Sequence, residues 1–425
     1  MVHKHGGDIY THSGARDFSA NINFRGMPGS VREAALRAVD ESVHYPDPDC
    51  RALRQALADF EKDGCRMAEP APKSGAARTA GTVPDGDTAV SAGTEICPEH
   101  IICGNGAAEL MFALAGACRP LRALLAVPSF YEYEQALEAF GCAISRYALK
   151  AERAFSLDED FLNAAARFAE DMEQLPASGA EELSQMPVPR NEGTARGGER
   201  AMIILGSPNN PTGCVIETEI LRALIGLCAK KHIFLVLDES FFDFLSEEDR
   251  AKTFSGALAV PEVPEVFVIR SFTKIYALPG IRFGYGLCGD RLLLERMRRL
   301  LQPWNVSLVA QEAARAAVCE REFARESARL AAANRERMAG ALQDAGYQVF
   351  PSSANFLLLR GPENLAEYCL AHDFLIRDCS NFPGLERRGD GQAYFRVCVR
   401  SRAENEALLE VLCAGMQGRS DDAAV

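Results

Sequence analysis

The stretch RSFTKIYALPGIRFGYG, residues 270–286, places a single lysine, Lys274, among small hydroxyl residues and an arginine, Arg282, eight positions later. It continues the apolar run EVFVIRSF (265–272), which has the length and the β-branched content of a buried strand. A lone lysine is usually part of the solvated surface. Whether Lys274 has a functional role therefore has to be judged from the segments that surround it.

Upstream of this stretch lie further apolar runs of the same kind, separated by segments with helical periodicity. They are ALLAVPS (123–129), AMIILGSP (201–208) and IFLVLDES (233–240). Strands without polar alternation are buried on both faces, and strands that alternate with helices form mainly parallel sheets. The pattern predicts an α/β domain around a mainly parallel sheet.

The two ends of the chain have a different organisation. Residues 30–39 and 50–64 carry apolar side chains at helical spacing, and a long amphipathic helix is predicted over about 307–345. Beyond this helix, short apolar runs follow at NFLLLR (355–360), FLIRDC (374–379) and YFRVCVR (394–400). These features predict a smaller α+β C-terminal domain that is built together with the N-terminal segment.

We therefore divide the chain into three parts. They are an N-terminal segment that packs on the small domain and the active site (1–40), a large domain (41–295) and a small domain (296–425). Two segments of the large domain, about 65–98 and 170–200, are polar and poor in large apolar residues. Their composition predicts flexible surface insertions.

The composition disfavours several kinds of partner. The net charge of −13 argues against nucleic acid or an anionic membrane surface, because the field of the protein repels polyanions. No apolar run approaches the roughly 20 residues that span a bilayer, and the N-terminus lacks the apolar core of a signal peptide. The 14 cysteines include no CxxC pair, so we expect reduced core residues and no metal site. A cytoplasmic protein is expected.

Polar residues follow the predicted strands at the edge of the sheet where ligands bind in open α/β folds. Asn210 lies in GSPNNPTG after one strand, Asp238 follows the next, and Lys274 follows the last. The glycine-rich CGNGAAEL (103–110) opens a helix whose N–H groups can hold a phosphate. Each piece alone has an ordinary alternative, since NNPTG can be only a turn and a strand-end aspartate is usually a cap or an ion-pair partner.

Taken together, the motifs point to one class of enzyme. The order GNGAAE, PSFYEY, SPNNPTG, LDES and SFTK, with Arg282 beyond it, resembles the fold type I pyridoxal 5′-phosphate (PLP) enzymes of the class I/II aminotransferase superfamily. The resemblance covers almost the whole chain apart from the two insertions. It implies an α/β fold of the PLP-dependent transferase type, with a mainly parallel seven-stranded sheet in the large domain and a smaller α+β C-terminal domain.

The resemblance implies a role for each matching residue. Lys274 would anchor the cofactor aldehyde covalently and later carry the proton at the substrate Cα, while Asp238 would keep the pyridine nitrogen protonated. Asn210 would donate to the phenolic oxygen, and Phe130 would stack on the ring. The cofactor phosphate would be held by Ala107, Ala108, Ser271, Thr273 and Arg282. Phe241 departs from the family pattern, in which a tyrosine often binds the phenolic oxygen.

Motifs near the two ends of the chain indicate which members of this superfamily the sequence resembles. Similarity to the threonine-phosphate decarboxylases of cobalamin biosynthesis, close relatives of the histidinol-phosphate aminotransferases, is found in HGGDIY (5–10), DFSANINFRGMP (17–28), YPDPDCRALRQALA (45–58), FLIRDCSNFPGL (374–385) and YFRVCVRS (394–401). This resemblance implies that Arg396 binds the substrate carboxylate, that Asn210 also faces the substrate, and that Tyr45 reaches into the partner subunit's site in a homodimer. The substrate phosphate would be surrounded by His5, Gly6, Asn21 and Arg377.

The residues themselves leave alternatives open. His5 could belong to a frayed terminus, and Arg377 and Arg396 could form structural ion pairs. The reaction depends on which bond at Cα stands perpendicular to the cofactor ring, an angle that no motif shows. We expect decarboxylation of L-threonine O-3-phosphate to (R)-1-amino-2-propanol O-2-phosphate. The rivals are an aminotransferase of the histidinol-phosphate type, a phosphoserine decarboxylase and a catalytically silent regulatory protein that binds PLP.

Overall fold

A computed structural model describes residues 5–68, 95–174 and 201–422. The two predicted insertions, about 65–98 and 170–200, lie mostly outside the described residues. Helices α2 (Arg51–Ala68) and α5 (Glu159–Glu173) occupy the first residues of these segments, so helix continues further than the composition predicted. In the described part, no helix combines the length and the apolar character needed to cross a membrane.

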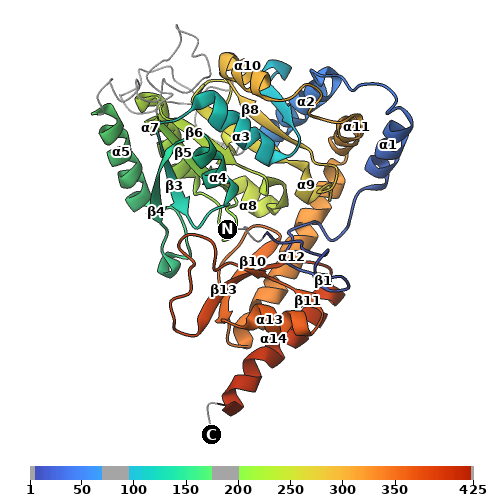
Figure 1. Ribbon diagram of the computed structural model, residues 1–425, viewed down its shortest axis with the longest axis vertical. Helices are drawn as coiled ribbons and strands as arrows, with labels where there is room; N and C mark the ends of the chain where they lie inside the picture. Colours follow the sequence, from blue (N-terminus) through green and yellow to red (C-terminus); the bar gives the residue numbers. More distant parts are fainter. Residues whose placement is uncertain (1–4, 69–94, 175–200, 423–425) are drawn as a thin grey trace, which may run out of the picture.

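The large domain is built on a mainly parallel sheet, which confirms the prediction from the strand pattern (Figure 1). In the described residues this sheet has seven strands, in the spatial order β2 (Ile101–Gly104), β8 (Gly284–Cys288), β7 (Val266–Ser271), β6 (Phe234–Asp238), β5 (Ala201–Gly206), β3 (Arg122–Val127) and β4 (Ala143–Ala148). Strand β8 runs antiparallel to both of its neighbours, and the other neighbouring pairs are parallel. The carboxyl ends of β5, β6 and β7 therefore meet at one edge.

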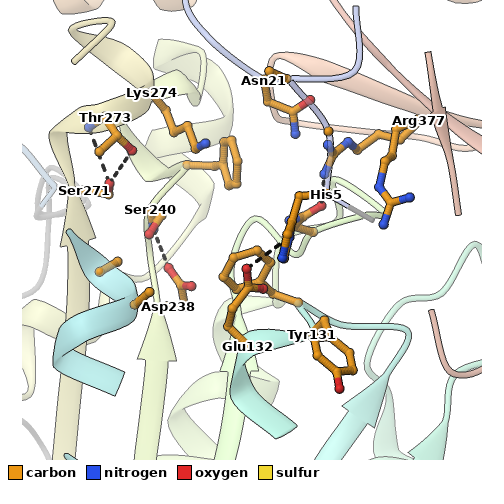
Figure 2. A pocket seen from close by; sticks show the side chains of 18 of the residues that line it. His5, Asn21, Tyr131, Glu132, Asp238, Ser240, Ser271, Thr273, Lys274 and Arg377 are labelled. Carbon is orange, nitrogen blue, oxygen red and sulfur yellow. Dashed lines mark hydrogen bonds and ion pairs between the residues drawn. The ribbon is translucent and has the colours of Figure 1, made fainter. Parts of the chain in front are cut away.

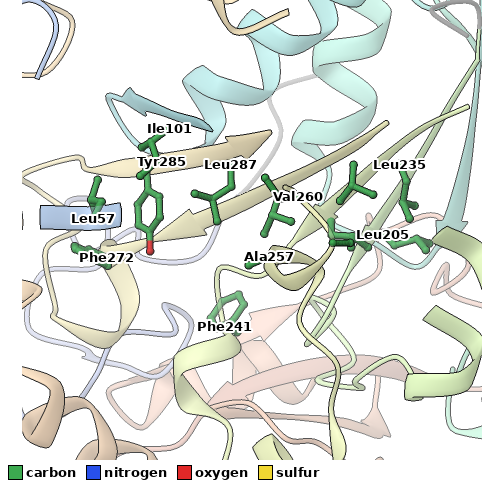
Figure 3. Close-up of a cluster of buried hydrophobic side chains, with 14 of the residues drawn as sticks. Leu57, Ile101, Leu205, Leu235, Phe241, Ala257, Val260, Phe272, Tyr285 and Leu287 are labelled. Carbon is green, nitrogen blue, oxygen red and sulfur yellow. The ribbon is translucent and has the colours of Figure 1, made fainter. Parts of the chain in front are cut away.

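Helices cover both faces of this sheet (Figure 1). One face packs on α3 (Ala107–Cys118), α4 (Glu132–Ala139) and α10 (Arg291–Leu300). The other face packs on α2, α5 and α7 (Thr218–Lys231), and α1 (Gly29–Asp40) joins the same core through α11 (Leu308–Ala317). Successive strand residues enter opposite cores, as Ile203 and Ile204 do, because side chains alternate along a strand. Figure 3 shows part of the core on the face of the sheet that is covered by α2, α5 and α7. Leu205 and Leu235, on neighbouring strands, belong to this core.

The small domain contains an antiparallel sheet with helices around it. Its elements are α12 (Arg321–Asp344), β9 (Gln348–Val349), β10 (Phe356–Pro362), α13 (Leu365–Ala371), β12 (Arg377–Asp378), β13 (Gln392–Cys398) and α14 (Arg402–Asp422). The N-terminal strand β1 (Arg16–Asp17) pairs in parallel with β11 (Phe374–Leu375), and Phe18 is buried in the small-domain core. The start of the N-terminal segment is therefore built into this domain, whereas α1 (Gly29–Asp40) packs in the large-domain core. The predicted segment 1–40 stays a prediction.

Short helical elements connect the main ones. They are α8 (Glu247–Lys252), α9 (Phe272–Ile275) and the single turns η1 (Pro98–His100), η2 (Ala151–Arg153), η5 (Phe242–Phe244) and η6 (Gly256–Leu258). Among these, α9 begins directly after β7 and carries Lys274. The lysine is thus held at the edge of the sheet by a turn that follows a buried strand.

The prediction of one long helix over residues 307–345 is wrong. The segment forms two helices, α11 (Leu308–Ala317) and α12, which are separated at residues 318–320. Helix α11 packs on α1 and lies in the large-domain core, whereas α12 contacts both η5 of the large domain and α14 of the small domain. Helix α12 therefore connects the two domains. The predicted domain boundary at residue 296 stays a prediction, and the packing of α11 argues for a boundary near residue 318.

Candidate active site

A cavity of about 260 Å³ opens at the carboxyl ends of β5, β6 and β7 (Figure 2). The large domain, the small domain and the N-terminal segment all contribute to its walls. The cavity brings together every predicted site residue except Tyr45, namely His5, Gly6, Asn21, Ala107, Ala108, Phe130, Asn210, Asp238, Ser271, Thr273, Lys274, Arg282, Arg377 and Arg396. This arrangement supports a single site for cofactor and substrate, and the individual roles stay predictions.

Lys274 faces this cavity from the one-turn helix α9 (Figure 2). Ser271 caps that helix, because its Oγ accepts a hydrogen bond from the N–H of Thr273. Burial, followed by the positive charges of Arg396 and Arg282, lowers the pKa of Lys274 to about 8. A neutral amine is a nucleophile, so this lysine is suited to bond covalently to an aldehyde close to neutral pH.

Asp238 is the last residue of β6, and two donors hold its carboxylate. Tyr133 donates its hydroxyl to Oδ2 at 2.7 Å, and the N–H of Ser240 donates to Oδ1 at 2.9 Å. Burial and the Asp238 charge raise the pKa of the Tyr133 hydroxyl well above its usual value, so this group remains a donor. Sequence reasoning missed Tyr133, although it lies in the motif PSFYEY, because only Phe130 of that motif was given a role.

The N-terminus of α3 and the corner between β7 and α9 form a cradle for an anion. Gly106 precedes α3 with a φ of 85°, and a Cβ at this position would lie 2.5 Å from Nη2 of Arg282. The hydroxyl oxygens of Ser271 and Thr273 lie 2.7 Å apart on the same wall. Backbone N–H groups, hydroxyls and a guanidinium are the donors that a phosphate ester requires. The cradle therefore fits the phosphate of PLP.

Gly106→Ala is expected to weaken PLP binding about tenfold, because the added Cβ would displace the guanidinium of Arg282 from the cradle. The affinity is measured by titrating the apoprotein with PLP and following the absorbance of the bound cofactor. Gly26→Ala is the matched control, since Gly26 also has a positive φ, of 73°, but no atom lies within 4 Å of the added Cβ. Both variants should lose thermal stability, and an unchanged PLP affinity in Gly106→Ala would contradict the cradle.

Arg396 projects from β13 into the cavity. Its Nη1 donates to Oδ1 of Asn210, and its Nη2 donates to the carbonyl oxygen of Ser19 at 2.6 Å. The Asn210 oxygen is thus occupied, which leaves the amide hydrogens of that side chain to donate inside the cavity. Among the described residues, Nε of Arg396 has no hydrogen-bond partner, and burial lowers the pKa of this arginine to about 10.

Arg377, in β12, is a second buried guanidinium of the cavity. Its Nη1 donates to the carbonyl oxygen of Asp378 at 2.6 Å, and its Nη2 donates to Oδ1 of Asn381 at 2.8 Å. Burial lowers the pKa of Arg377. Within residues 5–68, 95–174 and 201–422, neither Arg377 nor Arg396 has a carboxylate at ion-pair distance. The structural ion pairs considered above are therefore not found there.

The N-terminal segment forms one wall of the cavity. The N–H of Gly7 donates to Oγ of Ser19 at 2.7 Å, and a Cβ on Gly6 would lie 2.3 Å from the carbonyl oxygen of Ser19. Glycine at position 6 therefore permits this close approach. His5 lies with Nδ1 3.3 Å from Oε1 of Glu132, a residue that sequence reasoning did not select although it belongs to PSFYEY.

Three of the residues considered above need separate comment. Asn21 is buried in the cavity wall, and among the described residues its Oδ1 has no hydrogen-bond partner. Phe241 lines the cavity and packs edge-on against Phe356 with ring centroids 5.1 Å apart, so this position offers no hydroxyl to a ligand. Tyr45 lies outside the cavity, is 79% exposed and stacks on Trp304. Its role in the partner subunit's site stays a prediction.

Comparisons with known proteins agree with this geometry. The family described as Aminotransferase class I and II matches residues 16–412. Over 401 residues, 93% of this chain and 90% of the relative, the sequence is 32% identical to the threonine-phosphate decarboxylase of Salmonella typhimurium. The solved histidinol-phosphate aminotransferase of Clostridium acetobutylicum has a TM-score of 0.70 at 24% identity, covering 94% of this chain and 99% of that one. The solved L-threonine-O-3-phosphate decarboxylase of Porphyromonas gingivalis has a TM-score of 0.67 at 23% identity, and it too covers 94% of this chain and 99% of its own. Both solved structures share the fold of this chain.

Proposed function

Because this chain belongs to the class I and II aminotransferase family, we propose that it is a PLP-dependent decarboxylase of a phosphorylated amino acid. The substrate is L-threonine O-3-phosphate, and the product is (R)-1-amino-2-propanol O-2-phosphate, an intermediate of cobalamin biosynthesis. The similarity to threonine-phosphate decarboxylases, at 32% and 30% identity, supports this activity.

The observation that carries the proposal is the pair of buried guanidiniums, Arg377 and Arg396. A buried positive charge without a counter-charge is costly, so a cavity with two of them favours a ligand with two anionic groups. L-Threonine O-3-phosphate has a carboxylate for Arg396 and a phosphate for Arg377. Histidinol phosphate has only the phosphate, so in an aminotransferase of that type Arg396 would be compensated only by a carboxylate of the second substrate, glutamate.

The residues of the cavity fit PLP, which supplies, when bound, an electron-withdrawing ring that accepts the electron pair of a bond at the substrate Cα. Asp238 would accept a hydrogen bond from the protonated ring nitrogen, and Asn210 would donate to the phenolic oxygen. Phe130 would pack on the ring. The phosphate would be bound by the N–H groups of Ala107 and Ala108 and by the side chains of Ser271, Thr273 and Arg282.

The remaining residues would hold the substrate and move a proton. Arg396 would bind the carboxylate, while Arg377, His5 and Asn21 would bind the phosphate, and together they would fix the orientation of the bond from Cα to the carboxylate. That bond would break and carbon dioxide would leave, and the electron pair left at Cα would be withdrawn toward the ring. Nζ of Lys274 then delivers a proton to Cα, so a C–H bond replaces the C–C bond. A pKa of about 8 suits an amine that both donates and regains a proton.

Two rival reactions would use the same residues. In an aminotransferase, the Cα–H bond would stand perpendicular to the cofactor ring and Lys274 would remove that proton. A phosphoserine decarboxylase would differ in acting on a substrate without the methyl group. A catalytically silent PLP-binding protein is disfavoured, because Lys274 and Asp238 face the cavity together.

The proposal includes a homodimer in the cytoplasm. Helix α1 and the segment after it expose large apolar side chains, at Leu36, Val39, Val43 and Tyr45. Exposed apolar surface of this kind is typical of a protein interface, and Tyr45 lies on it as its predicted role in the partner subunit's site requires. The 13 cysteines whose side chains the structure describes are free thiols, which is the form that a reducing compartment maintains.

Product analysis of the PLP-loaded enzyme tests this function. L-Threonine O-3-phosphate, with no keto acid present, should release carbon dioxide and aminopropanol phosphate in equal amounts. Histidinol phosphate with 2-oxoglutarate should yield no glutamate. Glutamate in the second assay without carbon dioxide in the first would identify an aminotransferase, and faster release from O-phospho-L-serine would identify the phosphoserine decarboxylase.

A further inference from the structure

One carboxyl group of the cavity has no part in the function proposed above. Glu132 is the first residue of α4, and its side chain is 16% exposed. Burial raises the pKa of this carboxyl to about 7. Among the described residues, its Oε2 has no hydrogen-bond partner. A carboxylate close to a phosphate site needs an explanation, because it would repel the incoming dianion.

The contact between Glu132 and His5 provides that explanation. Oε1 lies 3.3 Å from Nδ1 of the imidazole, and Figure 2 shows the carboxyl group directed at the ring. A carboxylate on one ring nitrogen fixes the tautomer and the orientation of an imidazole and stabilises its protonated form. Since Nδ1 is held by Glu132, the other nitrogen, Nε2, is left to donate to a ligand.

The surroundings of His5 show why such a contact matters. The backbone beside it is held by the bond from Gly7 to Ser19 and by the close approach of Gly6, whereas the imidazole itself is 57% exposed. Burial and the charge of Arg377 lower the pKa of His5, so both disfavour the imidazolium. Glu132 is the carboxyl that lies at ion-pair distance from the imidazole. The charges of Lys274, Asp238 and Arg377 act on this carboxyl in turn.

Building on the proposed function, we propose that Glu132 is a positioning residue of the substrate-phosphate subsite. It holds His5 by Nδ1 so that Nε2 donates to a phosphate oxygen, and its negative charge compensates the imidazolium that a bound phosphate dianion induces. His5 takes up one proton from solvent when the dianion binds. Glu132 thus acts on the substrate through His5 and makes no contact of its own with the phosphate.

Calorimetric titration of the PLP-loaded enzyme with inorganic phosphate tests this inference without any turnover. Glu132→Gln keeps the size of the side chain and removes its charge, and we expect it to weaken phosphate binding about tenfold. Glu138→Gln, an exposed position on the same helix, is the matched control and should bind phosphate as the wild type does. In buffers of different ionisation enthalpy, the wild type should take up protons on binding and Glu132→Gln should take up fewer.

A double-mutant cycle separates action through His5 from an independent effect. His5→Ala should weaken phosphate binding, and adding Glu132→Gln to it should cause no further loss. In turnover, Glu132→Gln should raise the KM for the phosphorylated substrate and leave kcat within about twofold. Wild-type phosphate affinity in Glu132→Gln, or additive losses in the cycle, would overturn this inference alone. Failure of the wild type to bind phosphate would overturn the phosphate subsite and the proposed function with it.

Discussion

Lys274→Ala is expected to abolish covalent attachment of PLP and to lower the rate of carbon dioxide release by about 10⁴-fold, because the variant loses both the nucleophile and the proton carrier. Attachment is measured by borohydride reduction of the loaded enzyme, followed by mass spectrometry of its peptides. In the wild type, the reduced adduct should map to Lys274. A reduced adduct that persists at another lysine would show that Lys274 is not the anchor.

Lys274→Arg separates the charge of this residue from its chemistry. The guanidinium keeps the positive charge in the cavity but does not lose its proton near neutral pH, so this variant should be as inactive as Lys274→Ala while retaining a similar overall fold. The pH dependence gives a second check. Because burial lowers the pKa of Lys274 to about 8, the neutral amine accumulates as pH rises through about 8. The rate of PLP attachment to the apoprotein should rise over the same range.

Arg377→Ala is expected to lower kcat/KM for L-threonine O-3-phosphate by about 10²-fold, which corresponds to about 3 kcal/mol for the loss of a buried charge contact with a phosphate. The expected change is mainly in KM, since the phosphate contact is present in the bound substrate as well as in the transition state. Steady-state kinetics with the phosphorylated and an unphosphorylated amino acid measure the effect. The unphosphorylated substrate should be turned over poorly by the wild type and no worse by the variant.

Arg387→Ala is the matched control for Arg377→Ala. Arg387 belongs to the same domain and pairs with the carboxylate of Asp378 at 2.9 Å, but it is partly exposed and does not line the cavity. Its loss removes the same formal charge, so a kcat/KM within about twofold of the wild type is expected from screening of an exposed pair. Equal losses on phosphorylated and unphosphorylated substrates in Arg377→Ala would remove the phosphate role from that residue.

Much of the cofactor side of the cavity was predictable because its residues follow local signals. Asp238 and Lys274 each come directly after an apolar run, and parallel strands bring their carboxyl ends to one edge. The residues that were missed lack such a signal. Glu132 and Tyr133 lie in a recognised motif, but whether their side chains face the cavity depends on how α4 packs on the sheet. The break between α11 and α12 was missed because the apolar periodicity continues through it, and only the packing partners differ.

The sequence by itself determined the α/β architecture and the row of residues at the strand ends, since periodicity and motif order are local properties of the chain. The order of the motifs also indicated a PLP site, through the resemblance to the class I/II aminotransferase superfamily. Only the tertiary structure decided how the distant segments meet. Arg396 contacts Asn210, which lies 186 residues earlier in the sequence. His5, near the N-terminus, contacts Glu132 of the large domain. Such contacts arise when the small domain and the N-terminal segment close over the sheet. No local pattern encodes that closure, because it depends on the packing of whole domains.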